Sequence, residues 1–151
     1  MAVTYFGNND SGNAHTTFTA SYNFGTRFLC GTTGTLTEIG LNLYAAGATD
    51  SFRLGVYADN AGAPGALLLD AGAVVNPASA GWNSITGLSL AVSSGIYYWL
   101  TFNNSTAADS VCYWSTGNSY YAAHAYGALV DPFGAATLLS GYGMCMRAGV
   151  T

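Results

Sequence analysis

The clearest structural signal in the chain lies in residues 95–102, which read GIYYWLTF. Every second side chain from Ile96 to Phe102 is apolar, and this is the period of a β-strand with one buried face. The intervening side chains, Tyr97 and Trp99 among them, are also large. The pattern predicts either a central strand covered on both faces or a strand whose second face is a binding surface.

The rest of the chain repeats this alternation in short segments between glycine-rich turns, and helical periodicity is nearly absent. Besides 95–102, we expect strands over residues 17–24, 35–44, 51–57, 67–75, 82–92, 110–115 and 141–150. The strongest turn signal lies in residues 58–65, and residues 119–132 fit either a helical turn or an extended insertion. Many short strands indicate a single all-β domain, which we expect to be a jelly-roll-like antiparallel β-sandwich of about eight or nine strands.

Three finer expectations concern the ends and the register. Residues 1–15 are polar, so we expect an N-terminal arm there and the sandwich in residues 16–151. Leu36 is out of phase with Ile39, which predicts a β-bulge between them, with Gly40 as a candidate position. The strand that ends the chain fits a sandwich closed by pairing of its two termini.

Charge is scarce. The 151 residues contain no lysine, three arginines and seven acidic residues, for a net charge of -4. Phosphate binding needs clustered lysine and arginine, so nucleic acid and anionic membranes are not expected partners. No apolar run is long enough for a transmembrane helix. Lysine commonly protects edge strands, so we expect the edges to be covered by loops, by the arm or by another subunit of a homo-oligomer.

Catalytic residues are not expected, and neither are cofactors. His15 and His124 lie in loop-like segments, and no serine stands in a Gly-x-Ser-x-Gly motif. Aspartates at turns are explained by backbone capping. Calcium is the one metal that the residues suggest, with Asp59 and Asn60 as candidate ligands, although a turn explains both.

The three cysteines, Cys30, Cys112 and Cys145, are widely spaced. We expect buried free thiols, with one disulfide and one free thiol as the alternative.

Aromatic side chains are the most informative class for function. Some fall on outward strand faces or in loops, where they are candidate ligand-binding residues for a glycan or a protein partner: Tyr57, Tyr97, Trp99, Trp114, Tyr120 and Tyr121. Rings stack on the apolar faces of sugars without charge. Two alternatives to glycan binding stay open. In the first, Tyr97 and Trp99 fill a second layer of the sandwich, and in the second, the aromatic rings contact another protein.

Residues 52–68, FRLGVYADNAGAPGALL, together with Gly81-Trp82-Asn83 and residues 95–100, resemble a jelly-roll module of bacterial surface proteins and phage structural proteins. In that module a Tyr-small-Asp-Asn-Gly-Pro-Gly hairpin precedes a Gly-Trp strand and a Gly-x-Tyr-Trp strand. The resemblance covers residues 35–103 and carries no catalytic residues. It implies either a carbohydrate-binding module of a surface protein or a phage decoration or fibre protein.

Residues 1–13 contain neither the basic nor the apolar segment of a secretory signal. With the scarce charge, this favours a non-enzymatic structural module that assembles with itself or other proteins on a virion. The alternative is a carbohydrate-binding module that stacks a neutral glycan on exposed aromatic rings. The expected location is a virion or an extracellular surface.

Overall fold

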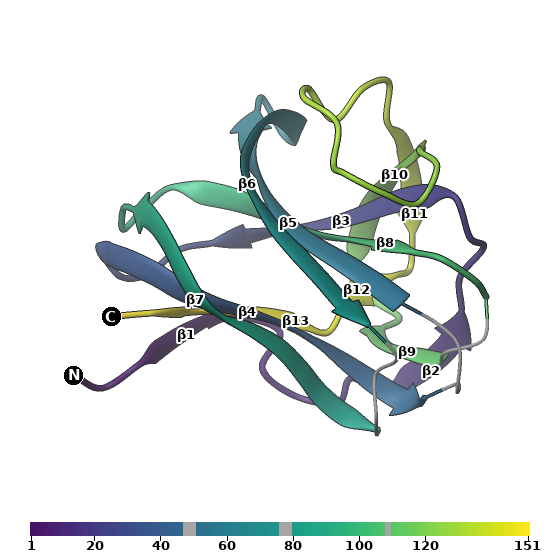
Figure 1. The fold of residues 1–151 in the computed structure, drawn as a ribbon, viewed down its shortest axis with the longest axis horizontal. Coiled ribbons are helices and arrows are strands. Elements are labelled where there is room, and N and C mark those ends of the chain that lie inside the picture. The colour runs from purple at the N-terminus through teal and green to yellow at the C-terminus, as the bar shows by residue number, and fades with distance from the viewer. Residues whose placement is uncertain (47–50, 76–79, 108–109) are drawn as a thin grey trace.

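The computed structural model describes residues 1–46, 51–75, 80–107 and 110–151, and shows thirteen strands in these ranges. They form two antiparallel sheets packed face to face as a β-sandwich (Figure 1). The all-β sandwich is therefore confirmed. The expected strand number was too low, because the expected segments 17–24 and 141–150 each contain parts of two strands and because residues 4–7, 118–123 and 137–140 form strands as well. No helix in these ranges is long and apolar enough to cross a membrane.

The seven-stranded sheet has the order β1-β13-β4-β9-β12, with β2 paired to β9 and β7 paired to β4. Its members are β1 (Thr4–Gly7), β2 (Ala14–Thr17), β4 (Gly34–Ala45), β7 (Gly81–Val92), β9 (Ser110–Trp114), β12 (Gly143–Met144) and β13 (Met146–Val150).

The six-stranded sheet has the order β11-β10-β3-β8-β5-β6. Its members are β3 (Tyr22–Leu29), β5 (Ser51–Asn60), β6 (Ala63–Val75), β8 (Tyr97–Asn104), β10 (Asn118–Ala123) and β11 (Thr137–Ser140).

The core fills the space between the sheets with alternate side chains of both, as the period of two predicts. In β8, Tyr98, Leu100 and Phe102 point into this core, which confirms the predicted phase. Ile96 is 49% exposed and precedes the strand, so its expected place on the buried face was wrong. The reason is that residues 93–96 form the turn into β8, with the Ile96 amide donating to Ser93 O.

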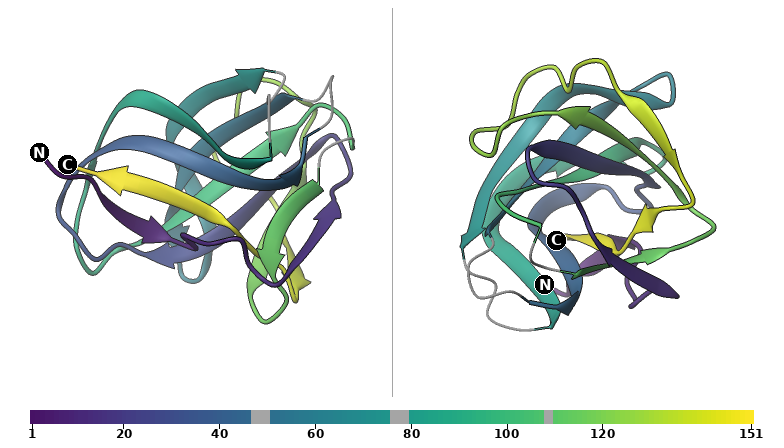
Figure 2. Two further views of the ribbon diagram at one scale, coloured as in Figure 1. Left: turned by 90° about the horizontal axis from the view of Figure 1, so that it is seen from below. Right: turned by 90° about the vertical axis from the view of Figure 1, so that its right-hand side faces the viewer.

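The N-terminal segment is part of the sandwich, which corrects the expected arm at residues 1–15. β1 pairs with β13 over Thr4–Gly7, and β2 pairs with β9 from Ala14 onward. The other residues of β1 are more polar than Phe6, and the Phe6 side chain enters the core. The predicted pairing of the two chain ends is confirmed, and both termini lie side by side in Figure 2.

The strand expected over residues 17–24 is interrupted. β2 belongs to one sheet and β3 to the other, and the chain crosses between them at residues 18–21. Ser21 has a positive φ of 64° at this crossing. Phe18 is nevertheless buried, because the crossing carries its ring into the end of the core.

The predicted bulge in β4 is confirmed between Leu36 and Ile39. Against β13, Glu38 pairs with Gly149 and Leu36 with Val150, so that Thr37 is an extra residue in β4. Against β7 the register also shifts between Leu36 and Glu38, but there the extra residues lie in β7, where Gly87 has a φ of 75°. Gly40, the candidate position, pairs regularly with Ser84.

The turn signal at residues 58–65 forms a tight hairpin between β5 and β6. Ala61 and Gly62 have φ values of 52° and 90°, the two positive angles of a type I′ turn. Residues 119–132, which the sequence left open, give most of β10 and then an irregular segment. All three cysteines are buried free thiols, as expected.

Candidate ligand-binding site

The six aromatic residues proposed from the sequence do not form one surface. Tyr57 and Trp99 point away from the core, as their phase predicts, but they are 0% and 2% exposed. They form a second apolar cluster on the outer face of the six-stranded sheet, against which Tyr120 packs. An exposed stacking platform built on Tyr57 and Trp99 is therefore absent, and the second-layer alternative holds for Trp99.

Residues 124–136, here called the strap, contain Leu129 and Phe133, which pack in one cluster with these two rings. Figure 1 draws the strap as the irregular yellow-green segment between β10 and β11. Phe133 packs edge-on against Tyr57, with ring centroids 5.1 Å apart. Leu129 lies over Gly55, where a Cβ would overlap its side chain. The strap is thus an apolar cover, and β5 needs a glycine beneath it.

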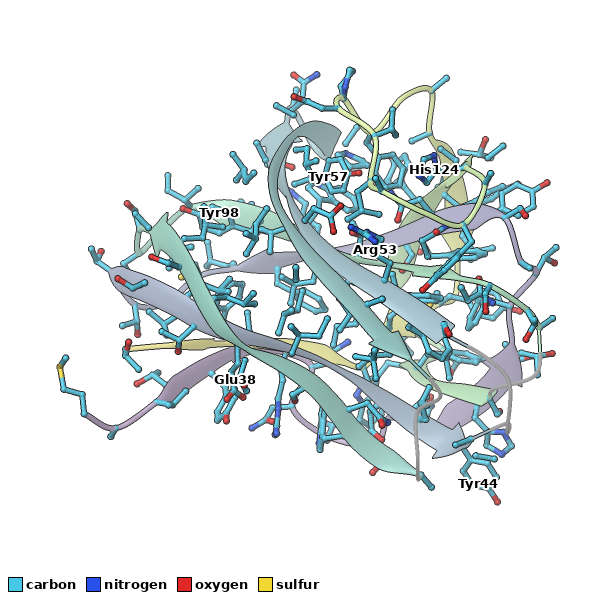
Figure 3. All side chains as sticks on the ribbon, viewed as in Figure 1. Glu38, Tyr44, Arg53, Tyr57, Tyr98 and His124 are labelled. Atoms are coloured by element: carbon cyan, nitrogen blue, oxygen red, sulfur yellow. The ribbon has the colours of Figure 1, made fainter. Side chains whose placement is uncertain are left out.

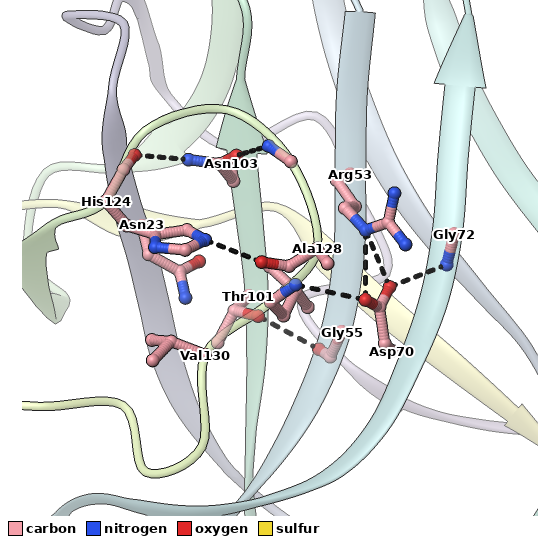
Figure 4. Close-up of polar contacts among 12 residues, drawn as sticks. Asn23, Arg53, Gly55, Asp70, Gly72, Thr101, Asn103, His124, Ala128 and Val130 are labelled. Atoms are coloured by element: carbon pink, nitrogen blue, oxygen red, sulfur yellow. Dashed lines mark hydrogen bonds and ion pairs between the residues drawn. The ribbon is translucent and has the colours of Figure 1, made fainter.

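Buried polar side chains hold the backbone of the strap (Figure 4). The Asn103 amide donates to His124 O at 3.1 Å and accepts from Gly127 N at 3.3 Å. The Tyr57 hydroxyl donates to Val130 O at 2.8 Å, and burial raises the pKa of this hydroxyl to about 12. These groups satisfy irregular backbone, which a buried loop requires.

Asp70 anchors the strap to the sheet edge. Its carboxylate accepts hydrogen bonds from the Arg53 guanidinium at 2.9 Å, from Leu129 N at 3.0 Å and from Gly72 N at 3.0 Å. Burial alone raises the pKa of the Asp70 carboxyl, but these donors outweigh burial and bring the pKa below its usual value. The ionised carboxylate is therefore part of the fold.

Asp59, the candidate calcium ligand, is engaged by the protein itself. Arg27 donates to both of its oxygens at 2.8 Å, Trp99 Nε1 donates at 2.9 Å and Gly62 N at 3.4 Å. The Arg27 guanidinium holds the pKa of the Asp59 carboxyl below its usual range. Four donors fill the roughly four lone-pair positions of a carboxylate, and a cation would have to displace Arg27.

Asn60 ends β5 and is exposed. Among the described residues, no group of three or more His, Cys, Asp or Glu side chains is placed to hold a metal ion.

Trp114 lies on the outer face of the seven-stranded sheet, where its Nε1 donates to Asp10 at 2.8 Å. On the same face the Arg147 guanidinium stands 4.4 Å from the Tyr5 ring centroid and 4.2 Å from that of Trp82. The Tyr5 and Trp82 rings stack on Arg147, and Trp114 anchors the segment between β1 and β2, whereas Tyr121 belongs to the other sheet.

The two histidines lie on opposite sides of the molecule. His15 stacks on Tyr44 with ring centroids 3.5 Å apart and lies 3.0 Å from Ser110 Oγ. His124 Nε2 lies 2.9 Å from Ala128 O. Figure 3 shows Tyr44 on the side opposite to His124.

The thiols of Cys112 and Cys145 are not activated as nucleophiles. Burial raises the pKa of Cys112, and burial together with Asp10 raises the pKa of Cys145 to about 12. The protonated thiol is a poor nucleophile.

A cavity of about 360 Å³ opens between the two sheets beside the chain crossing. We call it the hydroxyl pocket. It is lined by Thr16, Thr17, Phe18, Thr19, Tyr22, Phe24, Tyr121, Leu139 and Tyr142. Small-molecule sites have volumes of about 300–1,000 Å³, so the pocket falls at the small end of that range.

Contacts between rings make the pocket wall rigid. Phe18 packs on Phe24 at 5.0 Å and edge-on against Tyr142 at 5.8 Å. Tyr22 packs edge-on against Tyr121 at 5.7 Å. The two phenylalanines are buried and give the pocket an apolar floor.

The polar groups that side chains supply to the pocket are all hydroxyls. Six lining residues carry one: Thr16, Thr17, Thr19, Tyr22, Tyr121 and Tyr142. Within the described chain, only the hydroxyl of Thr16 makes a hydrogen bond to protein, a long one of 3.5 Å to Thr17 O. The others remain able to donate to and accept from a ligand.

Of the residues proposed from the sequence, the pocket contains Tyr121 alone. The other lining residues of the pocket lie on segments that are about a hundred residues apart in the sequence. Sheet pairing brings these segments together, and no local sequence pattern reveals it. One local signal was present: the run Thr16-Thr17-Phe18-Thr19 surrounds a buried ring with hydroxyls at a break in strand alternation.

Comparison with known proteins gives matches among solved structures alone. No family model and no curated protein matches the chain. The structure is similar to that of the cysteine protease and lectin-like domains of Cwp84, a surface layer associated protein of Clostridium difficile, with a TM-score of 0.54 and 11% identity. The match covers 86% of this chain but 32% of that one, and falls on its lectin-like part. At this identity the likeness establishes the fold, an all-β sandwich shared with a lectin-like domain.

Proposed function

We propose that this protein is a non-enzymatic carbohydrate-binding module that takes a neutral sugar in the hydroxyl pocket. One observation carries the proposal: a rigid pocket of sugar-compatible size has aromatic walls and six hydroxyl groups, of which Thr16 alone bonds to another described residue. Sugars have apolar C–H faces and a periphery of hydroxyls. Aromatic rings suit the faces, and hydroxyl groups suit the periphery because each both donates and accepts.

The absence of charge among the lining residues selects against acidic sugars. A carboxylate or sulfate that enters the pocket loses water and finds no arginine, lysine or histidine there. An unpaired buried charge is strongly unfavourable. The net charge of -4 repels anions as well.

The sequence left two interpretations, a virion protein and a carbohydrate-binding module. The similarity to a structure with a lectin-like domain supports the carbohydrate-binding module. It also supports an extracellular or surface location, because that neighbour is a surface layer associated protein. The virion role, self-association and the absence of catalysis stay predictions.

An NMR titration tests the proposal at the site itself. Neutral methyl glycosides of glucose, galactose, mannose and N-acetylglucosamine are added to ¹⁵N-labelled protein, each beside its uronic acid counterpart where one exists. We expect amide shifts at Thr19 and Leu139 with at least one neutral glycoside and none with its acidic partner.

The Tyr121→Phe variant keeps the ring and removes one hydroxyl. We expect roughly fivefold weaker binding, the usual effect of one hydrogen bond. Tyr44→Phe removes a hydroxyl outside the pocket and serves as the matched control, with unchanged affinity. Equal binding of the neutral and acidic glycosides, or equal affinity of both variants, contradicts the assignment.

A further inference from the structure

A second crevice lies at the other end of the six-stranded sheet. Its volume is about 320 Å³, and it is lined by Ala58, Asp59, Gly95, Ile96, Tyr97 and Tyr98. It forms where β5 and β8 separate, because their pairing ends at Ala58 and Tyr98. We call it the Tyr97 crevice.

The Tyr97 ring at this crevice is both exposed and held in place. It is 38% exposed, and the Arg27 guanidinium covers one of its faces at 3.6 Å from the centroid. Arg27 is fixed in turn by two hydrogen bonds to Asp59, which also accepts from Trp99 Nε1. Ring contacts are stronger when the ring does not have to be immobilised on binding.

Tyr97 lines the crevice, and Arg27, which stacks on the Tyr97 ring, is not among the lining residues. Ile96, 49% exposed, adds apolar surface next to it. The crevice thus combines a ring that is held in place with an apolar neighbour.

The two cavities are too far apart for one sugar ring to fill both. β3 runs from one to the other: Phe24 lines the hydroxyl pocket, and Leu29 pairs with Tyr97. Phe24 and Leu29 are five steps apart along the strand, which is about 17 Å at roughly 3.3 Å per residue.

We propose that the Tyr97 crevice is a second, independent site for a neutral sugar, so that a single chain binds two glycans at once. The inference rests on the proposed function, because both cavities take the same class of ligand. Two sites on one chain cross-link separate glycans without any oligomer, and they add avidity on a surface that presents many copies.

The experiment uses the same panel of neutral methyl glycosides and follows two sets of amide signals, those of Thr19 and Leu139 and those of Asp59 and Ile96. Wild-type protein is expected to show saturable shifts in both sets. Tyr97→Ala should weaken the Asp59 and Ile96 set by at least roughly tenfold, the value of one lost stacking contact, and leave the other set unchanged.

The converse variant is Thr19→Arg, which fills the hydroxyl pocket from its exposed rim. It should abolish the ligand-induced shift of Leu139 and leave the Asp59 and Ile96 set unchanged. Leu29→Ala, an exposed apolar residue on the neighbouring strand and outside the crevice lining, is the control and should change neither set. If only the hydroxyl-pocket signals move in wild type, the second site is overturned and the proposed function stands. If neither set moves with any of the glycosides, both fail. If either single variant abolishes both sets, the sites are not independent and this inference fails.

Discussion

Ala61 is the first residue of the two-residue turn between β5 and β6, and its φ of 52° lies in the left-handed region. This conformation costs a residue with a Cβ about 1–2 kcal/mol. Asparagine tolerates it better, because its side chain bonds to nearby backbone.

Replacing Ala61 with asparagine should therefore stabilise the protein. We expect Ala61→Asn to raise the free energy of unfolding by about 0.5–1 kcal/mol, measured by urea denaturation. Gly62→Ala, which places a Cβ at φ 90°, should lower it by about 1 kcal/mol. A loss of stability in Ala61→Asn would contradict the turn assignment.

Single residues also show the limit of strand phase as a predictor. The phase placed Tyr57 and Trp99 on an outward face correctly, but it carries no information on what covers that face. The covering segment, residues 124–136, has no period of its own. Strand phase therefore predicted on which side of the sheet these two rings lie, but not that they are buried.

At the level of elements, the strap is the feature that decides which surface remains free. Two side chains of neighbouring strap residues make a matched pair, because Leu129 is 7% exposed and Val130 is 40% exposed. Leu129→Ala should leave a cavity over Gly55 and lower the free energy of unfolding by about 2–3 kcal/mol. Val130→Ala should change it by less than about 0.5 kcal/mol. Equal effects in urea denaturation would mean that the strap does not pack as described.

The strap should also respond to acid through Asp70. Its pKa in the folded chain is lowered, relative to about 3.9 in an unfolded chain. A lowered folded pKa adds stability above the unfolded pKa, and this stability is lost as the pH falls through the folded value. We therefore expect the free energy of unfolding to drop below about pH 4, with faster hydrogen exchange of the Leu129 amide.

Asp70→Asn provides the comparison for this pH dependence. The variant should be less stable than wild type at pH 7 and should lose less stability between pH 5 and pH 3, because the contribution of the ionised Asp70 is missing. A wild-type acid loss that is identical in Asp70→Asn would show that this carboxylate is not responsible.

For the molecule as a whole, the structure changes the meaning of the missing lysine. β6 is an edge strand with three register shifts against β5, and β7 is bulged at Gly87. The other described edges are strands of two to four residues. Bulges and short edges also prevent edge-to-edge pairing, so the absence of lysine does not require a second subunit.

The sequence predicted the architecture better than the site, for a physical reason. Alternation and turn chemistry are local, and they predicted the sandwich, the inward face of β8, the bulge after Leu36 and the closure by the chain ends. The hydroxyl pocket depends on tertiary pairing, which brings the crossing at residues 16–19 beside Tyr121 and Leu139. Its contents follow from the fold and not from any one segment.

A crystal structure of the protein with the neutral glycoside that gives the largest NMR shifts tests the central claim most directly. We predict a sugar ring in the hydroxyl pocket, in contact with Tyr22 and Tyr121 and within hydrogen-bond distance of at least one of the threonines at the rim. A sugar bound elsewhere, with the hydroxyl pocket empty at saturating ligand, would contradict it.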